Sequence, residues 1–238
     1  MRLTMAVVLV AALGCSAPAS ACRLALVLAL DVSASVDDQE YRLQAMGTAA
    51  ALRAPSVRAA LLDPELPPVA IAAFVWSGPS DQDLVADWTL IDSAATLDAL
   101  AARVAGHPRN LAASGRTATG EALLVAGAVL GSAPPCDRQV VDLATDGTFN
   151  AGTAPELVRS SAAFRDITIN ALAVTGGQVP DWRDGGKPET ALAAYLTRLV
   201  IRGPGAFVEN ASGYSDLERA MTRKLERELA GMVVGQLR

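Results

Sequence analysis

Acids and hydroxyl side chains gather in three short motifs of the chain. Asp31, Ser33 and Ser35 alternate in ALDVSAS, at the end of a strongly apolar run. In an extended segment, alternating side chains point to the same side, so these three would converge. Thr117 lies in SGRTATGEAL, directly before a predicted helix, and Asp146 ends the strand-like run VVDLATD. Together the motifs offer two carboxylates and three hydroxyls.

A set of oxygen atoms of this kind is what a hard divalent cation requires. Mg²⁺ and Mn²⁺ prefer carboxylate, carbonyl and water oxygens. Two carboxylates balance the charge of a dication, while neutral hydroxyls leave the metal electron-poor and able to accept a further carboxylate. The sequence therefore predicts an Mg²⁺ or Mn²⁺ site formed by these five residues, with Asn150 and Glu121 as weaker candidates at its rim.

A purely structural interpretation of the same residues is the alternative. Ser35 could cap a helix that begins near Asp37, and Ser33 could close a turn. Thr117 could cap the helix that follows it, and Asp146 stands in the common turn dipeptide Asp-Gly. This interpretation requires three independent coincidences at three element boundaries, so we favour the metal site.

The elements that must position these residues alternate between strands and helices. Apolar runs and alternating patterns predict strands at 24–30, 69–75, 84–90, 139–144, 167–174 and 206–209. Helical periodicity predicts helices at 37–53, 93–106, 119–130 and 188–199, and two capping boxes predict helix starts at 153–156 and 215–218. Such alternation indicates a mostly parallel sheet covered on both faces. Ligands of these sheets bind beyond the carboxyl ends of the strands, where the strand order reverses.

The first residues are typical of a secretion signal. Arg2 supplies a positive end, residues 3–13 form an apolar core, and Ala19-Ser20-Ala21 fits a cleavage site. We therefore expect a signal peptide over 1–21, cleaved after Ala21, and a secreted or periplasmic bacterial protein. Lipidation at Cys15 is an alternative to ordinary cleavage.

Two cysteines remain after the signal, and their spacing is informative. Cys22 lies nine residues before Asp31, and Cys136 lies ten residues before Asp146. If the strands that end at these acids are parallel neighbours, both cysteines lie at the opposite end of the sheet, within reach of each other. On that condition we predict a disulfide between Cys22 and Cys136.

Here the three motifs, taken together, resemble the von Willebrand factor A (vWA) domain family. The pattern is Asp-x-Ser-x-Ser after the first buried strand, Gly-x-Thr-x-x-Gly-x-Ala-Leu before a helix, and Thr-Asp-Gly after a later strand. In that family the motifs form the metal-ion-dependent adhesion site (MIDAS), which implies the same five ligands here. The resemblance covers residues 24 to about 229, and INALAV, GPGAFV and RKLERE resemble an uncharacterised branch of secreted bacterial vWA-like proteins.

The resemblance implies an α/β fold. We expect a Rossmann-like, doubly wound, mostly parallel six-stranded sheet of order 3-2-1-4-5-6, with one antiparallel edge strand and helices on both faces. The strands that end at Asp31 and Asp146 would then be neighbours. No segment of the sequence has the character of a linker, so we expect residues 22–238 to form a single vWA-like domain.

Composition and charge exclude several classes of protein. A formal net charge of −5 and a pI of about 4.9 argue against a nucleic-acid partner, because nucleic-acid-binding proteins present a basic face. The apolar core of the signal is too short to span a bilayer, and we expect no stable membrane span after cleavage. One histidine and two mature cysteines do not suit a zinc site.

The favoured function is an exported, metal-dependent protein-binding module for adhesion or assembly, and not an enzyme. A partner's Asp or Glu carboxylate would complete the metal coordination. The first alternative is a metal-dependent phosphatase or hydrolase with Asp31 as nucleophile. Ser33 stands where such enzymes place a second acid, and neither Lys187 nor Lys224 lies near a motif. A second alternative is a structural envelope domain in which the metal only stabilises the fold.

Overall fold

A six-stranded sheet forms the centre of the computed structural model, which describes residues 22–109, 115–175 and 188–230. The strands lie in the order β3-β2-β1-β4-β5-β6, and only the edge pair β2·β3 is antiparallel. Their bounds are β1 Leu24–Asp31, β2 Val69–Trp76, β3 Gln82–Ile91, β4 Gln139–Thr145, β5 Ile167–Val174 and β6 Val208–Ala211. The predicted fold class, strand order and antiparallel edge are confirmed.

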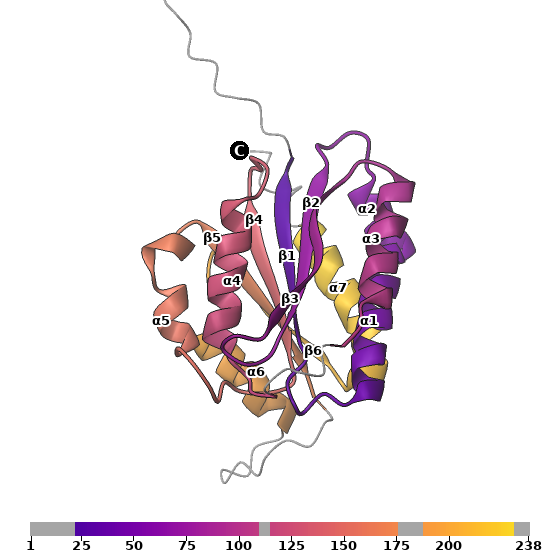
Figure 1. The fold of residues 1–238 in the computed structure, drawn as a ribbon. Helices are drawn as coiled ribbons and strands as arrows, with labels where there is room; N and C mark the ends of the chain where they lie inside the picture. The colour runs from indigo at the N-terminus through magenta and orange to yellow at the C-terminus, as the bar shows by residue number, and fades with distance from the viewer. Residues whose placement is uncertain (1–21, 110–114, 176–187, 231–238) are drawn as a thin grey trace, which may run out of the picture.

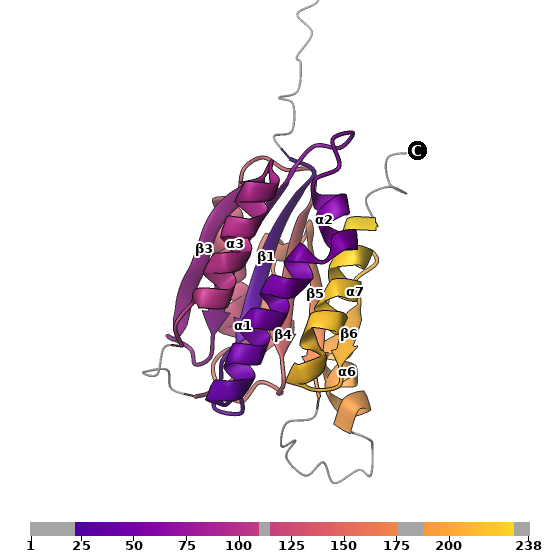
Figure 2. The same cartoon turned by 90° about the vertical axis from the view of Figure 1, so that its right-hand side faces the viewer.

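Helices cover both faces of this sheet (Figures 1 and 2). One face carries α1 Asp38–Arg53, α2 Pro55–Leu61, α3 Ala94–Gly106 and α7 Leu217–Ala230. The other carries α4 Thr119–Gly131, α5 Pro155–Arg159 and α6 Pro188–Leu199. Two short 3-10 turns, η1 Ala162–Phe164 and η2 Tyr214–Asp216, complete the described elements.

The two faces of β1 carry side chains of different size. Its leucines, such as Leu26 and Leu28, face the core beneath α1 and α7, while Ala25 and Ala29 face α4. Small residues on β1 allow α4 to pack close to the sheet. Gly120 in α4 allows a different close approach, to the loop before α5, because a Cβ there would lie 2.0 Å from the backbone oxygen of Thr153.

Helix α1 begins at a complete capping box. Asp37 is the N-cap, and its Oδ1 accepts hydrogen bonds from the backbone N–H groups of Gln39 and Glu40 at 2.8 Å. The Glu40 carboxylate accepts in return from the Asp37 N–H at 2.9 Å. Ser35 therefore is not the cap of this helix, which removes one of the structural interpretations of its motif.

Three local predictions are wrong. Thr153 does not cap α5, whose N-cap is Ala154, because the Thr153 hydroxyl donates to Glu121 instead. The second capping box is also unused, since η2 leads directly into α7 and Asp216 accepts from the Ser212 N–H. The last strand lies at Val208–Ala211, two residues later than predicted.

The disulfide lies at the amino end of the sheet. Cys22 and Cys136 are bonded, with their Cα atoms 4.5 Å apart and a separation of 114 positions in sequence. They stand just ahead of β1 and β4, which pair in parallel from Ala25↔Gln139 to Leu30↔Ala144. The parallel pairing thus supplies the condition on which the disulfide was predicted.

Candidate metal centre

The predicted motifs meet at the carboxyl end of the sheet, opposite the disulfide. Asp31 is the last residue of β1, and Asp146 directly follows β4. These strands are neighbours at the centre of the sheet, and the chain builds outward from them in opposite directions to β3 and to β6. Strand order reverses here, which is where α/β sheets bind ligands.

Asp31 is fully buried and held in one orientation. Its Oδ1 accepts from the Ser33 N–H at 2.8 Å, and its Oδ2 accepts from the Thr145 hydroxyl at 2.5 Å. The buried amide of Gln44 in α1 donates to the Asp31 backbone carbonyl at 2.9 Å, which fixes the end of β1. The side chain is thus oriented before any ligand arrives.

A continuous run of oxygen atoms leads from Ser33 to Asp146. Oγ of Ser33 lies 3.1 Å from Oγ of Ser35, and the Ser35 hydroxyl donates to Asp146 Oδ1 at 2.7 Å. Neighbouring ligands of an octahedral Mg²⁺ with metal–oxygen distances of about 2.1 Å lie about 3 Å apart. The spacing of these three oxygens therefore fits a hard cation.

Thr117 approaches the same place from the loop before α4. The side chain is buried, and its Oγ1 lies 3.8 Å from the position of a Cβ on Gly147, the residue after Asp146. Asn150 holds this loop, because its Oδ1 accepts from the Thr117 N–H and its own N–H donates to the Thr117 carbonyl, both at 3.0 Å. Asn150 thus positions a candidate ligand.

Glu121, the other weak candidate, turns away from the predicted ligands. Its Oε1 accepts hydrogen bonds from the Thr153 N–H at 2.8 Å and from the Thr153 hydroxyl at 2.9 Å. The carboxylate also lies against Gly152, where a Cβ would come within 2.0 Å of it. Glu121 therefore joins α4 to the loop that precedes α5.

The first two motifs are in direct contact. The Ala34 N–H donates to the Gly115 carbonyl at 3.0 Å, so the Ser33–Ser35 turn is fastened to the loop that carries Thr117. Gly115 has φ +71°, and a Cβ there would lie 2.9 Å from Cβ of Ala34. Only glycine allows both this backbone conformation and this close approach.

Two carboxylates share this buried place without a compensating cation. Burial and the Asp146 charge raise the pKa of Asp31 to about 7, against the hydrogen bonds from Thr145 and Ser33. Burial raises the pKa of Asp146, as does the nearby charge of Glu40, against the hydrogen bond from Ser35. A divalent cation would relieve this repulsion.

Sequence reasoning missed the residues that surround the predicted ligands. Thr145 directly precedes Asp146, and a hydroxyl residue beside a candidate ligand is only a weak indication of a role in the site. Gln44 and Tyr214 come from α1 and from η2, far from the motifs in sequence, and no local pattern distinguishes them.

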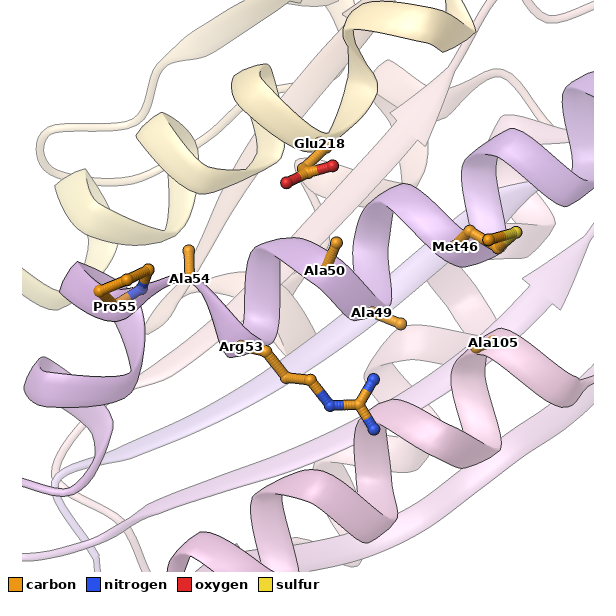
Figure 3. A pocket seen from close by; sticks show the side chains of 8 residues that line it. All are labelled: Met46, Ala49, Ala50, Arg53, Ala54, Pro55, Ala105 and Glu218. Carbon is orange, nitrogen blue, oxygen red and sulfur yellow. The ribbon is translucent and has the colours of Figure 1, made fainter.

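Two grooves among the described residues lie away from the predicted ligands. One of about 480 Å³ opens between α1, α3 and the start of α7 (Figure 3). Its lining consists of Met46, Ala49, Ala50, Arg53, Ala54, Pro55, Ala105 and Glu218. A second continues from it between α2 and α7. Neither of these two grooves is lined by a predicted ligand.

Two further searches of the described ranges bear on the class of site and protein. No three or more His, Cys, Asp or Glu side chains there gather into a group that could hold a metal. No helix in the same ranges is long and apolar enough to cross a membrane.

The fold and strand order are those of a vWA domain. The sequence profile described as "Protein of unknown function (DUF1194)" matches residues 21–233, and the chain belongs to this family. No curated protein matches the chain.

Solved structures share this fold at low sequence identity. The pilus adhesin SpaC from Lactobacillus rhamnosus GG is 16% identical with a TM-score of 0.63, covering 89% of this chain and 31% of that chain. Proximal thread matrix protein 1 from the mussel byssus, with a zinc-occupied MIDAS motif, is 18% identical with a TM-score of 0.59, covering 89% and 48%. The von Willebrand factor type A protein from Catenulispora acidiphila is 19% identical with a TM-score of 0.57, covering 87% and 43%. This chain thus spans less than half of each, and the likeness shows the fold alone.

Proposed function

We propose that this protein is an exported module that binds Mg²⁺ or Mn²⁺ and, through the metal, a protein partner. The proposed ligands are Asp31, Ser33, Ser35, Thr117 and Asp146. The observation that carries the proposal is the run of oxygen atoms from Ser33 through Ser35 to Asp146, beside the oriented carboxylate of Asp31. The shared fold of a pilus adhesin and of a matrix protein with an occupied MIDAS motif supports a binding role.

Each proposed ligand has a distinct task. Asp31 and Asp146 would neutralise the cation, and their repulsion in its absence favours binding. The hydroxyls of Ser33, Ser35 and Thr117 would add donors without adding charge. The bound metal would supply a positive, electron-poor centre that attracts a carboxylate. The partner is therefore expected to offer an Asp or Glu side chain.

The phosphatase alternative finds no support in the surroundings of Asp31. Ser33 occupies the position of a second acid, and its hydroxyl contacts Ser35. Lys224 in α7 is fully buried and lies between Asp142 and Glu228, where it cannot reach a phosphate. Lys187 lies outside the described residues. We therefore propose a binding protein and not an enzyme.

Export is part of the proposal. The predicted signal at 1–21 and Cys15 lie outside the described residues. The disulfide between Cys22 and Cys136 supports an oxidising compartment, since disulfides persist in secreted and periplasmic proteins and are rare in the cytosol. We propose a secreted or periplasmic location.

Partner capture tests this function. Wild-type protein, Asp31→Asn and Asp137→Asn would be immobilised and exposed to an envelope fraction in Mg²⁺ or in excess chelator. Asp137 is an exposed acid at the opposite end of β4, so its variant controls for loss of one charge. We expect wild type and Asp137→Asn to retain a partner protein in Mg²⁺. We expect no retention in chelator or by Asp31→Asn. Replacing the Asp or Glu of the partner that completes the metal coordination should also abolish retention. Retention that survives both chelator and Asp31→Asn would contradict the proposal.

A further inference from the structure

Tyr214 reaches the candidate site from a part of the chain that contains none of the motifs. It opens η2, directly after β6, and its side chain is 5% exposed. The ends of β5 and β6 are tied together by Thr175, whose N–H and hydroxyl both donate to the Ala211 carbonyl at 2.9 Å. Tyr214 therefore starts from the same carboxyl edge of the sheet as Asp146.

The Tyr214 hydroxyl is directed at the acids of the site. Within the described part of the chain its oxygen is buried without a hydrogen bond of good geometry. The charges that act on its phenol are Asp146 first, then Asp31 and Glu40. Conversely, Tyr214 is one of the side chains whose hydroxyl acts on Asp146. The phenol oxygen is thus buried near the acids of the site, and among the described residues it has no hydrogen-bond partner.

The two acids differ in how firmly they are held. Asp31 has a donor on each oxygen, from the Ser33 N–H and the Thr145 hydroxyl. Asp146 has a short side-chain hydrogen bond from Ser35, whose oxygen is itself a proposed ligand. A phenol with an ordinary pKa of about 10 keeps its proton at neutral pH and can donate it. Tyr214 is placed to give Asp146 a further side-chain donor besides Ser35.

We infer that Tyr214 is a positioning residue of the metal site, whose hydroxyl donates to Asp146 and holds that carboxylate toward the cation. The inference rests on the proposed metal binding and extends the site to the turn between β6 and α7. Outer donors of this kind orient metal-binding carboxylates, and their loss typically costs 10–100-fold in metal affinity.

The test is a matched pair of tyrosine variants titrated with Mg²⁺ and with Mn²⁺ by calorimetry. Tyr214→Phe removes the hydroxyl and keeps the buried ring. Tyr41→Phe is the control, because Tyr41 is also buried and its hydroxyl donates to the His107 carbonyl at 3.0 Å. We expect Tyr214→Phe to weaken metal binding about tenfold or more, and Tyr41→Phe to leave it unchanged. Urea unfolding of both variants would show whether each retains the wild-type fold.

A second measurement uses the unchanged protein. The chain has three tyrosines, so ring-labelled tyrosine gives three NMR signals, which the Phe variants assign. Mg²⁺ is expected to shift the Tyr214 signal, because the proposed hydrogen bond to Asp146 forms when the metal is bound, and to leave the Tyr41 signal in place. This readout responds to the hydroxyl and not to general stability.

The outcomes separate this inference from the proposed function. If wild type and Tyr214→Phe bind the metal with equal affinity, and the metal does not shift the Tyr214 signal, the role of Tyr214 is overturned. The proposed metal site is not affected by that result. No metal binding by wild type would overturn the proposed function and the inference together. Weaker binding by Tyr214→Phe with an unaltered unfolding transition, and a shifted Tyr214 signal, would support both.

Discussion

At the scale of single residues, the candidate site combines acids that repel each other with hydroxyls that separate them. The charge of Asp146 is close enough to Asp31 to disfavour ionisation of the Asp31 carboxylate. Ser35 stands between them in the hydrogen-bond pattern, since it contacts Ser33 on one side and Asp146 on the other. A cation at this place would replace repulsion by two attractions.

Ser35→Ala tests the contribution of a neutral ligand. The change removes the hydroxyl that joins Ser33 to Asp146 and leaves both acids in place, so metal binding should persist but weaken about tenfold or more. Ser35 is exposed and Asp37 caps α1, so the unfolding free energy should change little. Calorimetric titration with Mg²⁺ measures the first effect and urea unfolding the second. Wild-type affinity in this variant would remove Ser35 from the site.

Single residues with local chemical character could be predicted from the sequence, and those that act through the fold could not. The alternation of Asp31, Ser33 and Ser35 is a local pattern, and the structure places all three at the end of β1. Tyr214 has no local pattern, because its relevance depends on β6 lying two strands away from β4. Their role as metal ligands stays a prediction.

At the scale of elements, α7 is fastened to the sheet by a buried ionic network. Lys224 Nζ lies 2.6 Å from Asp142 Oδ1 in β4 and 2.7 Å from Glu228 Oε1 in its own helix. Asn170 in β5 donates to the same Glu228 oxygen at 2.8 Å. The side chains of this network are buried, so their ionisation depends on one another and not on contact with solvent.

Lys224→Met should destabilise the protein strongly. The change leaves two buried carboxylates without their cation, and breaking such a pair typically costs about 3–5 kcal/mol. Arg219→Met on the same helix is the matched control, because the Arg219 side chain is exposed and solvent screens its ion pair with Asp216, so the change in unfolding free energy should be small. Urea unfolding compares the two. Equal, small effects would show that the buried network does not hold α7.

Asp142 makes stability depend on pH. Burial raises the pKa of Asp142 to about 7, although Lys224 opposes the shift. In an unfolded chain an aspartate has a pKa of about 4. The folded state therefore binds the proton of the Asp142 carboxyl more tightly than the unfolded chain does. The contribution of this proton to the unfolding free energy is complete below pH 4 and is lost as the pH rises through 7.

Asp142→Asn should therefore flatten the fall in unfolding free energy between pH 5 and pH 8. Urea unfolding at a series of pH values measures the slope, with Asp137→Asn as the exposed control. If the unfolding free energy of Asp142→Asn falls with pH as steeply as that of wild type, the Asp142 carboxyl titrates normally in the folded protein.

Elements were predictable where one periodicity dominates. The continuous apolar run of β1 and the helical spacing of α3 both appear within one or two residues of the predicted bounds. Helix α2 was missed because Pro55 reads as the end of a helix, whereas proline also fits the first turn of a new one. The capping box at Thr153 was wrong because a tertiary partner, Glu121, competes for its hydroxyl.

At the scale of the whole molecule, the two ends of the sheet have different roles. The disulfide joins β1 to the approach of β4 at the amino end, and the candidate metal site joins the same strands at the carboxyl end. The strand order follows from the resemblance to vWA domains and could not be derived from periodicity, because pairing between distant strands leaves no local signature.

Replacing both Cys22 and Cys136 by Ser should lower stability without affecting the site. The bridge closes a loop of 114 residues, and loss of such a disulfide typically costs about 2–5 kcal/mol. Because it lies at the opposite end of the sheet, the affinity for Mg²⁺ should equal that of wild type under conditions where both proteins are folded. Chemical unfolding and calorimetry test the two parts. A large loss of metal affinity in the folded variant would show that the two ends are coupled.

The most direct test of the account is a calorimetric titration of Mg²⁺ and Mn²⁺ into the chelator-treated protein, beside Asp31→Asn and Asp137→Asn. The account predicts a single saturable site in wild type and in Asp137→Asn, and its loss in a folded Asp31→Asn variant. An absence of binding by wild type at millimolar metal, or equal binding by Asp31→Asn, would contradict it.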